Sequence, residues 1–224
     1  MINNILKYLR LKKMRGYIGG LKSVFENINI LDDIVNNNND QNFTIIEVGS
    51  ERGVGSTYHL GKYCLDNNLN FITIDPSEES NKSAKNILNK FNSRNLKAVK
   101  NKGENYLSNN NIDDILLAYL DGFDVIFPGS IVSKKRINFY KEFGIDFIKD
   151  GNRISAEVHL ETTKYIYKNI VDGGIIAFDD TFYENDQWFG KGQLAVPFLI
   201  ENGFNSINSI KRMRDHSILL QKNI

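Results

Sequence analysis

The sequence predicts an α/β protein: a Rossmann-like, doubly wound sheet of seven mostly parallel strands with helices on both faces. Short apolar runs alternate with helix-like segments from residue 43 to residue 221, which is typical of a parallel sheet covered on both sides. The first run, 43–48, leads into a turn with three glycines, as where a buried strand feeds a helix. Three later runs end in aspartate. Ligands bind beyond the carboxyl ends of such strands, so these acids mark the functional edge.

The elements are expected in a regular order. In the first helix-like segment Thr57, Leu60 and Cys64 share one face, and Pro76 with Ser77 begins the second. The expected strands are 43–48, 71–75, 96–101, 115–121, 175–180, 204–210 and 217–221, and the expected helices are 56–67, 76–91, a short one from 104, 154–171 and 192–201.

Size and charge narrow the class of protein. A chain of 224 residues fits one domain with a large core. Its net charge of +1 gives no field that attracts nucleic acid, so no nucleic-acid partner is expected. The single cysteine, Cys64, excludes an internal disulfide. No apolar run is long enough to span a bilayer, and charges interrupt the apolar residues from Ile5 to Met14, so a cytoplasmic location is expected.

The domain organisation is expected to be a helical extension, 1–40, followed by a main domain, 41–224, with an insertion at about 125–153. The basic amphipathic pattern of residues 2–17 favours packing on the domain or on a second subunit, which allows a homo-oligomer, over contact with a membrane surface. The insertion contains a basic cluster, 133–136, and Phe139 with Tyr140. Insertions at a ligand edge are often lids, and the basic cluster is either a solvated helix face or a contact for an anionic substrate.

The glycine turn has the spacing Gly49-x-x-x-Gly53-x-Gly55, preceded by Glu47 on the strand. Glycines let backbone N–H groups approach a nucleotide-like ligand. The spacing differs from the G-x-G-x-x-G of dinucleotide-binding proteins.

The acids that follow the strands are Asp75, Asp121, Asp179 and Asp180. Aspartate is also a common turn and helix-capping residue, which is the plainer reading for any one of them. Four along one edge of a sheet favour a functional site.

Taken together, segments 47–55, 72–75, 102–104, 120–124 and 173–181 resemble the motifs of class I S-adenosylmethionine-dependent methyltransferases, in the same order. The resemblance covers most of residues 43–220 and is strongest to metal-dependent O-methyltransferases of the catechol and macrocin sugar types. It implies that the glycine turn passes the methionine part of S-adenosylmethionine, with Glu47 near the methionine amino group. It also implies that Asp75 accepts hydrogen bonds from the ribose hydroxyls and that Glu104 accepts one from the adenine amino group. The implied cofactor-binding residues are Glu47, Gly49, Ser50, Gly53, Gly55, Ser56, Asp75, Glu104 and Asp121.

The resemblance also implies a metal site made by Asp121, Asp179 and Asp180. Carboxylate oxygens without thiolates suit Mg²⁺ or another hard divalent cation. A hydroxyl bound to such an ion becomes more acidic and attacks the sulfonium methyl more readily.

Three residues are candidates for catalysis. Asp124 stands three residues past Asp121, where catechol-type enzymes carry a lysine, so the base assignment stays open between Asp124 and His159. A lone histidine at such a position is as often a packed or capping residue. Lys191 is expected either to line the substrate pocket or to be a solvated loop residue.

The predicted function is methyl transfer from S-adenosylmethionine to a hydroxyl of a sugar or other small metabolite, assisted by a divalent cation. The alternatives are a nicotinamide-dependent oxidoreductase, a non-catalytic cofactor-binding module, and a metal-dependent hydroxylase or hydrolase on the same scaffold.

Overall fold

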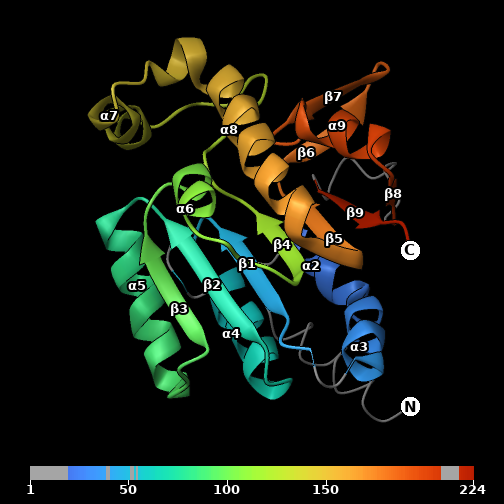
Figure 1. The fold of residues 1–224 in the computed structure, drawn as a ribbon. Coiled ribbons are helices and arrows are strands. Elements are labelled where there is room, and N and C mark those ends of the chain that lie inside the picture. The colour runs from blue at the N-terminus through green and yellow to red at the C-terminus, as the bar shows by residue number, and fades with distance from the viewer. Residues whose placement is uncertain (1–19, 39–40, 51–52, 54, 208–216) are drawn as a thin grey trace.

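The computed structural model describes residues 20–38, 41–50, 53, 55–207 and 217–224. Within them, seven strands form one sheet in the order β3-β2-β1-β4-β5-β9-β8 (Figure 1). Neighbours from β3 to β5 run parallel, whereas β9 is antiparallel to both β5 and β8. The predicted fold class is therefore confirmed. The strands are β1 (Thr44–Val48), β2 (Asn70–Asp75), β3 (Leu96–Lys100), β4 (Ile115–Leu120), β5 (Ile170–Phe178), β8 (Phe204–Ser206) and β9 (Ile218–Lys222).

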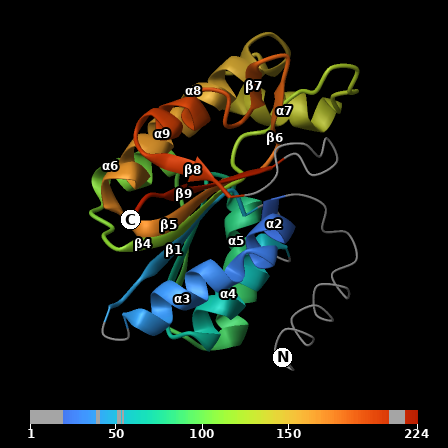
Figure 2. The same cartoon turned by 90° about the vertical axis from the view of Figure 1, so that its right-hand side faces the viewer.

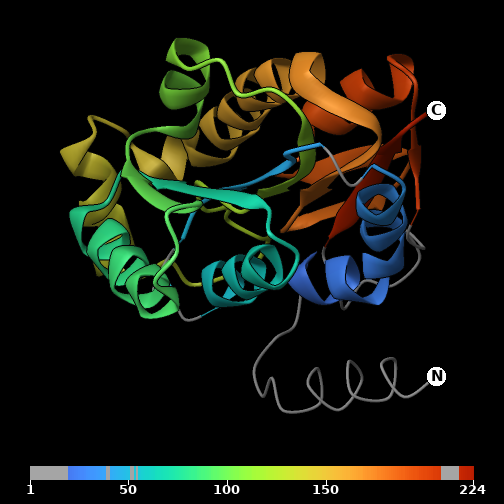
Figure 3. The same cartoon turned by 60° about the horizontal axis from the view of Figure 1, so that its bottom comes forward.

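Helices cover both faces of the sheet, as Figures 2 and 3 show. Helices α2 (Gly20–Glu26), α3 (Ile28–Asn37), α4 (Ser56–Asp66) and α5 (Glu78–Leu88) lie on one face. Helices α6 (Gly103–Asn109), α8 (Phe147–Asn169) and α9 (Ala195–Glu201) lie on the other. The buried apolar residues accordingly form two clusters, one on each side of the sheet.

The central strands β1 and β4 are buried at every position. A strand covered on both faces needs apolar side chains at successive positions, which is why Ile45 and Ile46 are adjacent. Ile46 lies in register with Ile72 of β2 and Ala118 of β4. This register brings the carboxyl ends of the three strands to one edge.

Helix α8 begins earlier than the sequence predicts. The insertion was expected to continue to residue 153, but α8 starts at Phe147 because Asp146 caps it and accepts a hydrogen bond from the Lys149 N–H at 3.2 Å. Gly151 lies inside the helix, where a Cβ atom would come within 2.6 Å of the Phe147 ring. The glycine therefore makes room for a neighbouring aromatic ring and does not end a loop. What remains of the insertion is a loop and helix α7 (Lys134–Glu142), which stands away from the sheet beside the start of α8.

A hairpin that the sequence analysis did not anticipate follows β5. Strands β6 (Thr181–Glu184) and β7 (Gln187–Gly190) pair antiparallel as a separate two-stranded sheet. Their two-residue loop has positive φ at both Asn185 and Asp186, 48° and 57°. Asn and Asp tolerate this conformation better than most residues, and such turns match the twist of a hairpin.

The N-terminal part of the chain is described from Gly20 onward. Helices α2 and α3 contribute Leu21, Val24 and Leu31 to the main core, so this stretch of the expected extension packs on the sheet. The amphipathic pattern at 2–17 lies outside the described residues. In the part of the chain that the structure describes, no helix is both long and apolar enough to cross a membrane.

Candidate active site

A cavity of about 580 Å³ opens at the carboxyl ends of β1, β2 and β4. One side is formed by the starts of α5 and α6, and the other by α7 and α8. Six of the predicted site residues line it: Gly49, Asp75, Glu104, Asp121, Asp124 and His159. The sheet edge that the sequence marked with acids is thus the edge that carries the cavity.

Gly49 and Gly53 are required by the packing of the glycine turn. Gly49 has φ +94°, and a Cβ atom there would come within 2.6 Å of the backbone of Asp121 and Gly122. Gly53 has φ +70°, and its Cβ would come within 2.9 Å of the Ala84 backbone nitrogen in α5. At these two positions the backbone is pressed against the residues that follow β4 and against α5, so only glycine fits there. Gly55 precedes α4 as its N-cap and Ser56 is the first residue of that helix.

Asp75 fixes the glycine turn to the start of α5. Its Oδ2 atom accepts a hydrogen bond from the Ser50 N–H at 2.9 Å and one from the Ser50 hydroxyl at 3.3 Å. Its Oδ1 atom accepts one from the Ser77 N–H at 2.8 Å. Asp75 also lines the cavity. The carboxylate predicted to bind the ribose hydroxyls is therefore at the cavity wall, and the N–H groups of Ser50 and Ser77 hold it in place.

Glu47 lies beneath the turn and has no exposed surface. The Thr57 hydroxyl donates a hydrogen bond to Oε2 at 2.6 Å, and Oε1 lacks a partner among the residues that the structure describes. Burial raises the pKa of Glu47 to about 7, although the hydrogen bond from Thr57 acts in the opposite direction. Glu47 is not among the residues that line the cavity, so its predicted contact with the cofactor amino group stays a prediction.

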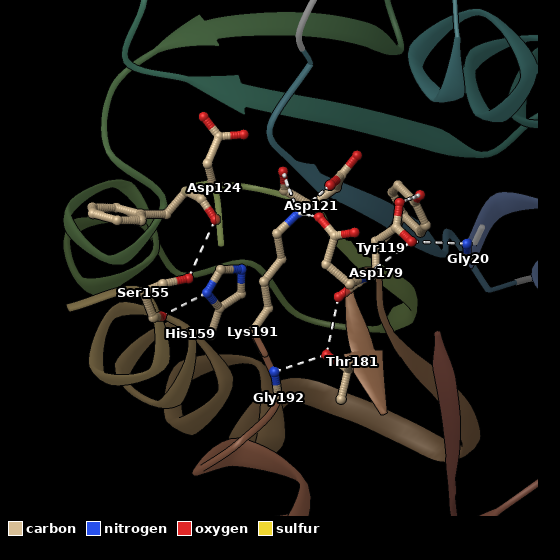
Figure 4. Close-up of polar contacts among 12 residues, drawn as sticks. Gly20, Tyr119, Asp121, Asp124, Ser155, His159, Asp179, Thr181, Lys191 and Gly192 are labelled. Carbon is tan, nitrogen blue, oxygen red and sulfur yellow. Dashed lines mark hydrogen bonds and ion pairs between the residues drawn. The ribbon is translucent and has the colours of Figure 1, made fainter. Parts of the chain in front are cut away.

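The carboxylates predicted to bind a metal ion have other partners (Figure 4). The Lys191 ammonium is ion-paired with Oδ1 of Asp121 and, at 2.9 Å, with Oδ2 of Asp180. The carboxylate of Asp179 points toward Tyr119 and Gly20. It accepts hydrogen bonds from the Tyr119 hydroxyl at 3.1 Å and from the Gly20 and Asp180 N–H groups, both at 3.0 Å.

These contacts do not fit the predicted metal site. A cation already lies between Asp121 and Asp180, and it belongs to the protein. Among the described residues, no group of three or more His, Cys, Asp or Glu side chains is arranged to hold a metal ion. The structure brings Asp121 and Asp180 together as predicted, but around a lysine, with Asp179 turned toward other donors.

Lys191 is 2% exposed. Burial by itself lowers the pKa of an ammonium group, but the charges of Asp121, Asp180 and Asp179 outweigh it and raise the pKa of Lys191. The side chain is therefore charged and paired at physiological pH. The expectation of a solvated loop lysine is wrong, because Lys191 is buried and held by two carboxylates. It is also not among the residues that line the cavity, so the expectation that it lines the substrate pocket is not met either.

His159 lines the cavity, but both of its ring nitrogens are turned into the protein. Its Nδ1 atom is 2.7 Å from the Ser155 carbonyl oxygen, one helical turn earlier. Because a carbonyl only accepts, Nδ1 carries the proton, and Nε2 is left with a lone pair. Within the described part of the chain Nε2 has no hydrogen-bond partner, and the residue is 2% exposed. Burial and the charge of Lys191 lower the pKa of His159 to about 3, so the ring is neutral.

Asp124 holds helix α7 in place. Its backbone N–H donates to the Tyr140 hydroxyl at 2.6 Å, and that hydroxyl donates to the Asp124 carboxylate at 3.3 Å. The same carboxylate is 2.9 Å from Nε of Arg136. Tyr140 also stacks on Phe147 of α8 with ring centroids 4.2 Å apart. These contacts favour a structural role for Asp124 over its predicted role as the base.

The sequence did not identify several residues that hydrogen-bond to the predicted site residues. Ser155 and Thr57 could have been found, because Ser155 lies four residues before His159 on one helix face, and Thr57 was already placed on a buried face. Tyr119 gave no signal, since an aromatic residue in a buried strand is most simply core.

Comparisons with known proteins support the fold. No protein-family model matches the sequence, and no curated protein matches it. Among solved structures, an rRNA methylase from Streptococcus thermophilus matches with TM-score 0.53 and 12% identity, covering 90% of this chain and 96% of that one. A candidate rRNA methylase from Clostridium thermocellum matches with TM-score 0.52 and 13% identity, covering 87% and 97%. At such identities the likeness concerns the fold, and together with the strand order it shows that this chain has the class I methyltransferase fold.

Proposed function

We propose that this protein transfers a methyl group from S-adenosylmethionine to a hydroxyl of a small molecule, such as a sugar or another hydroxylated metabolite. The observation that carries the proposal is one cavity at the ligand edge of a class I methyltransferase fold, with Asp75, Glu104 and His159 on its wall. The carboxylate of Asp75 would bind the ribose hydroxyls, and the carboxylate of Glu104 would bind the adenine amino group. The net charge of +1 supports a small acceptor over nucleic acid.

The proposed reaction forms a bond between the acceptor oxygen and the methyl carbon and breaks the bond from that carbon to sulfur. The sulfonium becomes a neutral thioether, and the hydroxyl proton leaves. In this proposal the His159 ring turns its buried Nε2 atom toward the cavity, accepts the hydrogen bond of the hydroxyl there, and directs an oxygen lone pair toward the methyl group. Because its pKa is about 3, the ring can orient the hydroxyl by accepting its hydrogen bond, but it is a weak base and does not keep the proton. The proton therefore passes from the site to solvent.

A nicotinamide-dependent oxidoreductase is less well supported. Dinucleotide-binding sheets of this type have the strand order 3-2-1-4-5-6, whereas here the last two strands in the chain are exchanged and β9 is antiparallel. The glycine spacing points in the same direction.

Calorimetry and an acceptor screen test the proposal. S-adenosylhomocysteine is expected to bind saturably and NAD to give no heat, and Asp75→Asn should weaken the binding by about tenfold because the carboxylate loses its hydrogen bonds to the ribose. A screen with isotope-labelled methyl donor should then give a product heavier by one methyl group. His159→Gln should lower kcat while leaving S-adenosylhomocysteine affinity unchanged. Saturable NAD binding, or product without a mass gain, would overturn the proposal.

A further inference from the structure

We infer that the Lys191 ammonium is the resident cation of this site and takes the place that a divalent metal ion holds in metal-dependent O-methyltransferases. The inference deepens the proposed function, because it makes methyl transfer independent of added metal. It rests on the ion pairs of Lys191 with Asp121 and Asp180.

The hairpin delivers Lys191 to this position. Thr181 and Gly190 are paired at the base of the hairpin, so the residue after Gly190 returns next to Asp180. The Lys191 N–H donates to the Asp180 carbonyl at 3.2 Å. The Gly192 N–H donates to the Thr181 hydroxyl at 2.9 Å, and that hydroxyl donates to the Asp179 carbonyl, also at 2.9 Å. These hydrogen bonds hold the backbone of residues 191–192 against that of residues 179–181. The lysine side chain extends from there toward Asp121 (Figure 4).

The Lys191 ammonium neutralises negative charge that a metal ion would otherwise neutralise. Asp121 and Asp180 are bound directly by Lys191, and the charge of Asp179 is stabilised by one hydroxyl and two N–H groups. Without Lys191, adjacent carboxylates in a partly buried edge would repel each other. A metal ion could enter between Asp121 and Asp180 only by displacing the lysine, whose side chain has almost no exposed surface.

Lys191 also fixes the cavity wall. Its ammonium lies 3.4 Å from the Asp121 carbonyl oxygen as well as on the Asp121 carboxylate. The turn after β4, against which Gly49 packs, is thus held from below by the lysine. Lys191 is a positioning residue, since it acts on the reaction through Asp121 and through the neutral ring of His159.

The inference is tested with Mn²⁺ as the probe, by electron paramagnetic resonance and by thermal unfolding. The metal-stripped wild-type protein is expected to bind no Mn²⁺ at millimolar concentration, to keep its melting temperature, and to bind S-adenosylhomocysteine equally well with and without EDTA. Lys191→Ala should bind Mn²⁺ at least about tenfold more tightly than the wild type, because two uncompensated carboxylates then face a space of suitable size. The double variant Lys191→Ala with Asp180→Asn should lose that gain.

Mn²⁺ binding by the wild-type protein, or unchanged Mn²⁺ affinity in a folded Lys191→Ala variant, would overturn the inference. The wild-type measurement decides it even where Lys191→Ala does not fold. The metal measurements need no turnover, so a protein that methylates none of the acceptors tested would count against the proposed function and leave this inference standing.

Discussion

Glu47 is a buried acid in the most central part of the sheet, and its protonation is coupled to folding. The unfolded chain holds this carboxyl at the ordinary pKa of 4.5, whereas the folded protein raises the pKa to about 7. Between these two values the folded state binds the proton more tightly. Ionisation of Glu47 therefore lowers the free energy of unfolding, and this loss develops as the pH rises from about 4.5 to about 7.

Glu47→Gln should remove this pH dependence. The variant is expected to match the wild type near pH 4 and to exceed it by about 3 kcal/mol at pH 8, because the buried amide has no charge to desolvate. Urea unfolding at both pH values measures the difference. Thr57→Val is the matched control, because it removes the hydrogen bond to Oε2 and should widen the pH dependence. Equal stabilities of Glu47→Gln and wild type at pH 8 would show that the carboxylate is ionised without penalty.

The neutral ring of His159 gives a second expectation at the residue scale. In ¹⁵N-histidine spectra, His159 should have its proton on Nδ1 and should not titrate between pH 5 and pH 8, because burial and Lys191 keep the pKa near 3. Lys191→Met should raise that pKa, because the positive charge of Lys191 is one of the two main causes that lower it. The signal is assigned by its loss in His159→Gln. A titration midpoint near the ordinary 6.5 would contradict the contacts described for this ring.

Single residues show where sequence reasoning succeeds. Gly49, Asp75 and Asp121 could be placed at the site because a strand end fixes where the next residue lies. The pairing of Lys191 with Asp121 could not, because the two residues are 70 positions apart and meet only through the hairpin. The role of Asp124 depended in the same way on Tyr140, which reaches it from a separate helix.

At the scale of elements, helix α7 is fastened over the cavity by one carboxylate. Asp124→Asn and Arg136→Met should each weaken acceptor binding, seen as a higher KM with a smaller change in kcat, because each loosens α7 without removing a group from the chemistry. The pair is half-exposed, so its direct contribution to stability is expected to be at most about 1 kcal/mol. A double-mutant cycle on KM should be non-additive. Loss of kcat in Asp124→Asn alone, with additive effects on KM, would restore Asp124 as the base.

The hairpin is the second element that decides the site. Gly190 has φ +87°, and a Cβ atom there would overlap the Asp180 carbonyl oxygen. Gly190→Ala is therefore expected to destabilise the protein by roughly 2–4 kcal/mol and to weaken S-adenosylhomocysteine binding, because Lys191 is displaced. Gly144→Ala is the control: its φ of +74° is similar, but a Cβ atom added there would have nothing within 4 Å, so only the conformational cost of about 1 kcal/mol remains. Equal losses in the two variants, measured by urea unfolding, would remove the steric argument.

These elements also show what a one-dimensional pattern misses. Strands β1 and β4 were predictable because buried parallel strands are apolar at successive positions. The hairpin was not predicted, since its strands are only four residues long and partly exposed, although Asn185 and Asp186 between aromatic residues carried a turn signal. The start of α8 was predicted too late because Gly151, which is typical of a helix breaker, serves side-chain packing here.

At the scale of the whole molecule, the cavity is formed by segments that lie far apart in the sequence. Its wall takes residues from the ends of β1, β2 and β4 and from α5, α6, α7 and α8. A ligand that fills it must stabilise the folded state by mass action, since the unfolded chain has no such cavity.

Thermal unfolding with S-adenosylhomocysteine should therefore show a concentration-dependent rise in melting temperature, equivalent to about 2.7 kcal/mol at a hundred times Kd. Asp75→Asn should reduce the rise because the proposed ribose contact and the anchor of the glycine turn, which is held by the hydrogen bonds from Ser50, are weakened together. Lys164→Met, on the exposed surface of α8 and paired with Glu161, is the control and should keep the full rise. The same experiment with added Mg²⁺ should give an unchanged curve, because Lys191 already supplies the positive charge between Asp121 and Asp180. A rise that appears only with Mg²⁺ present would mean that ligand and metal enter this cavity together and that the lysine gives way to them.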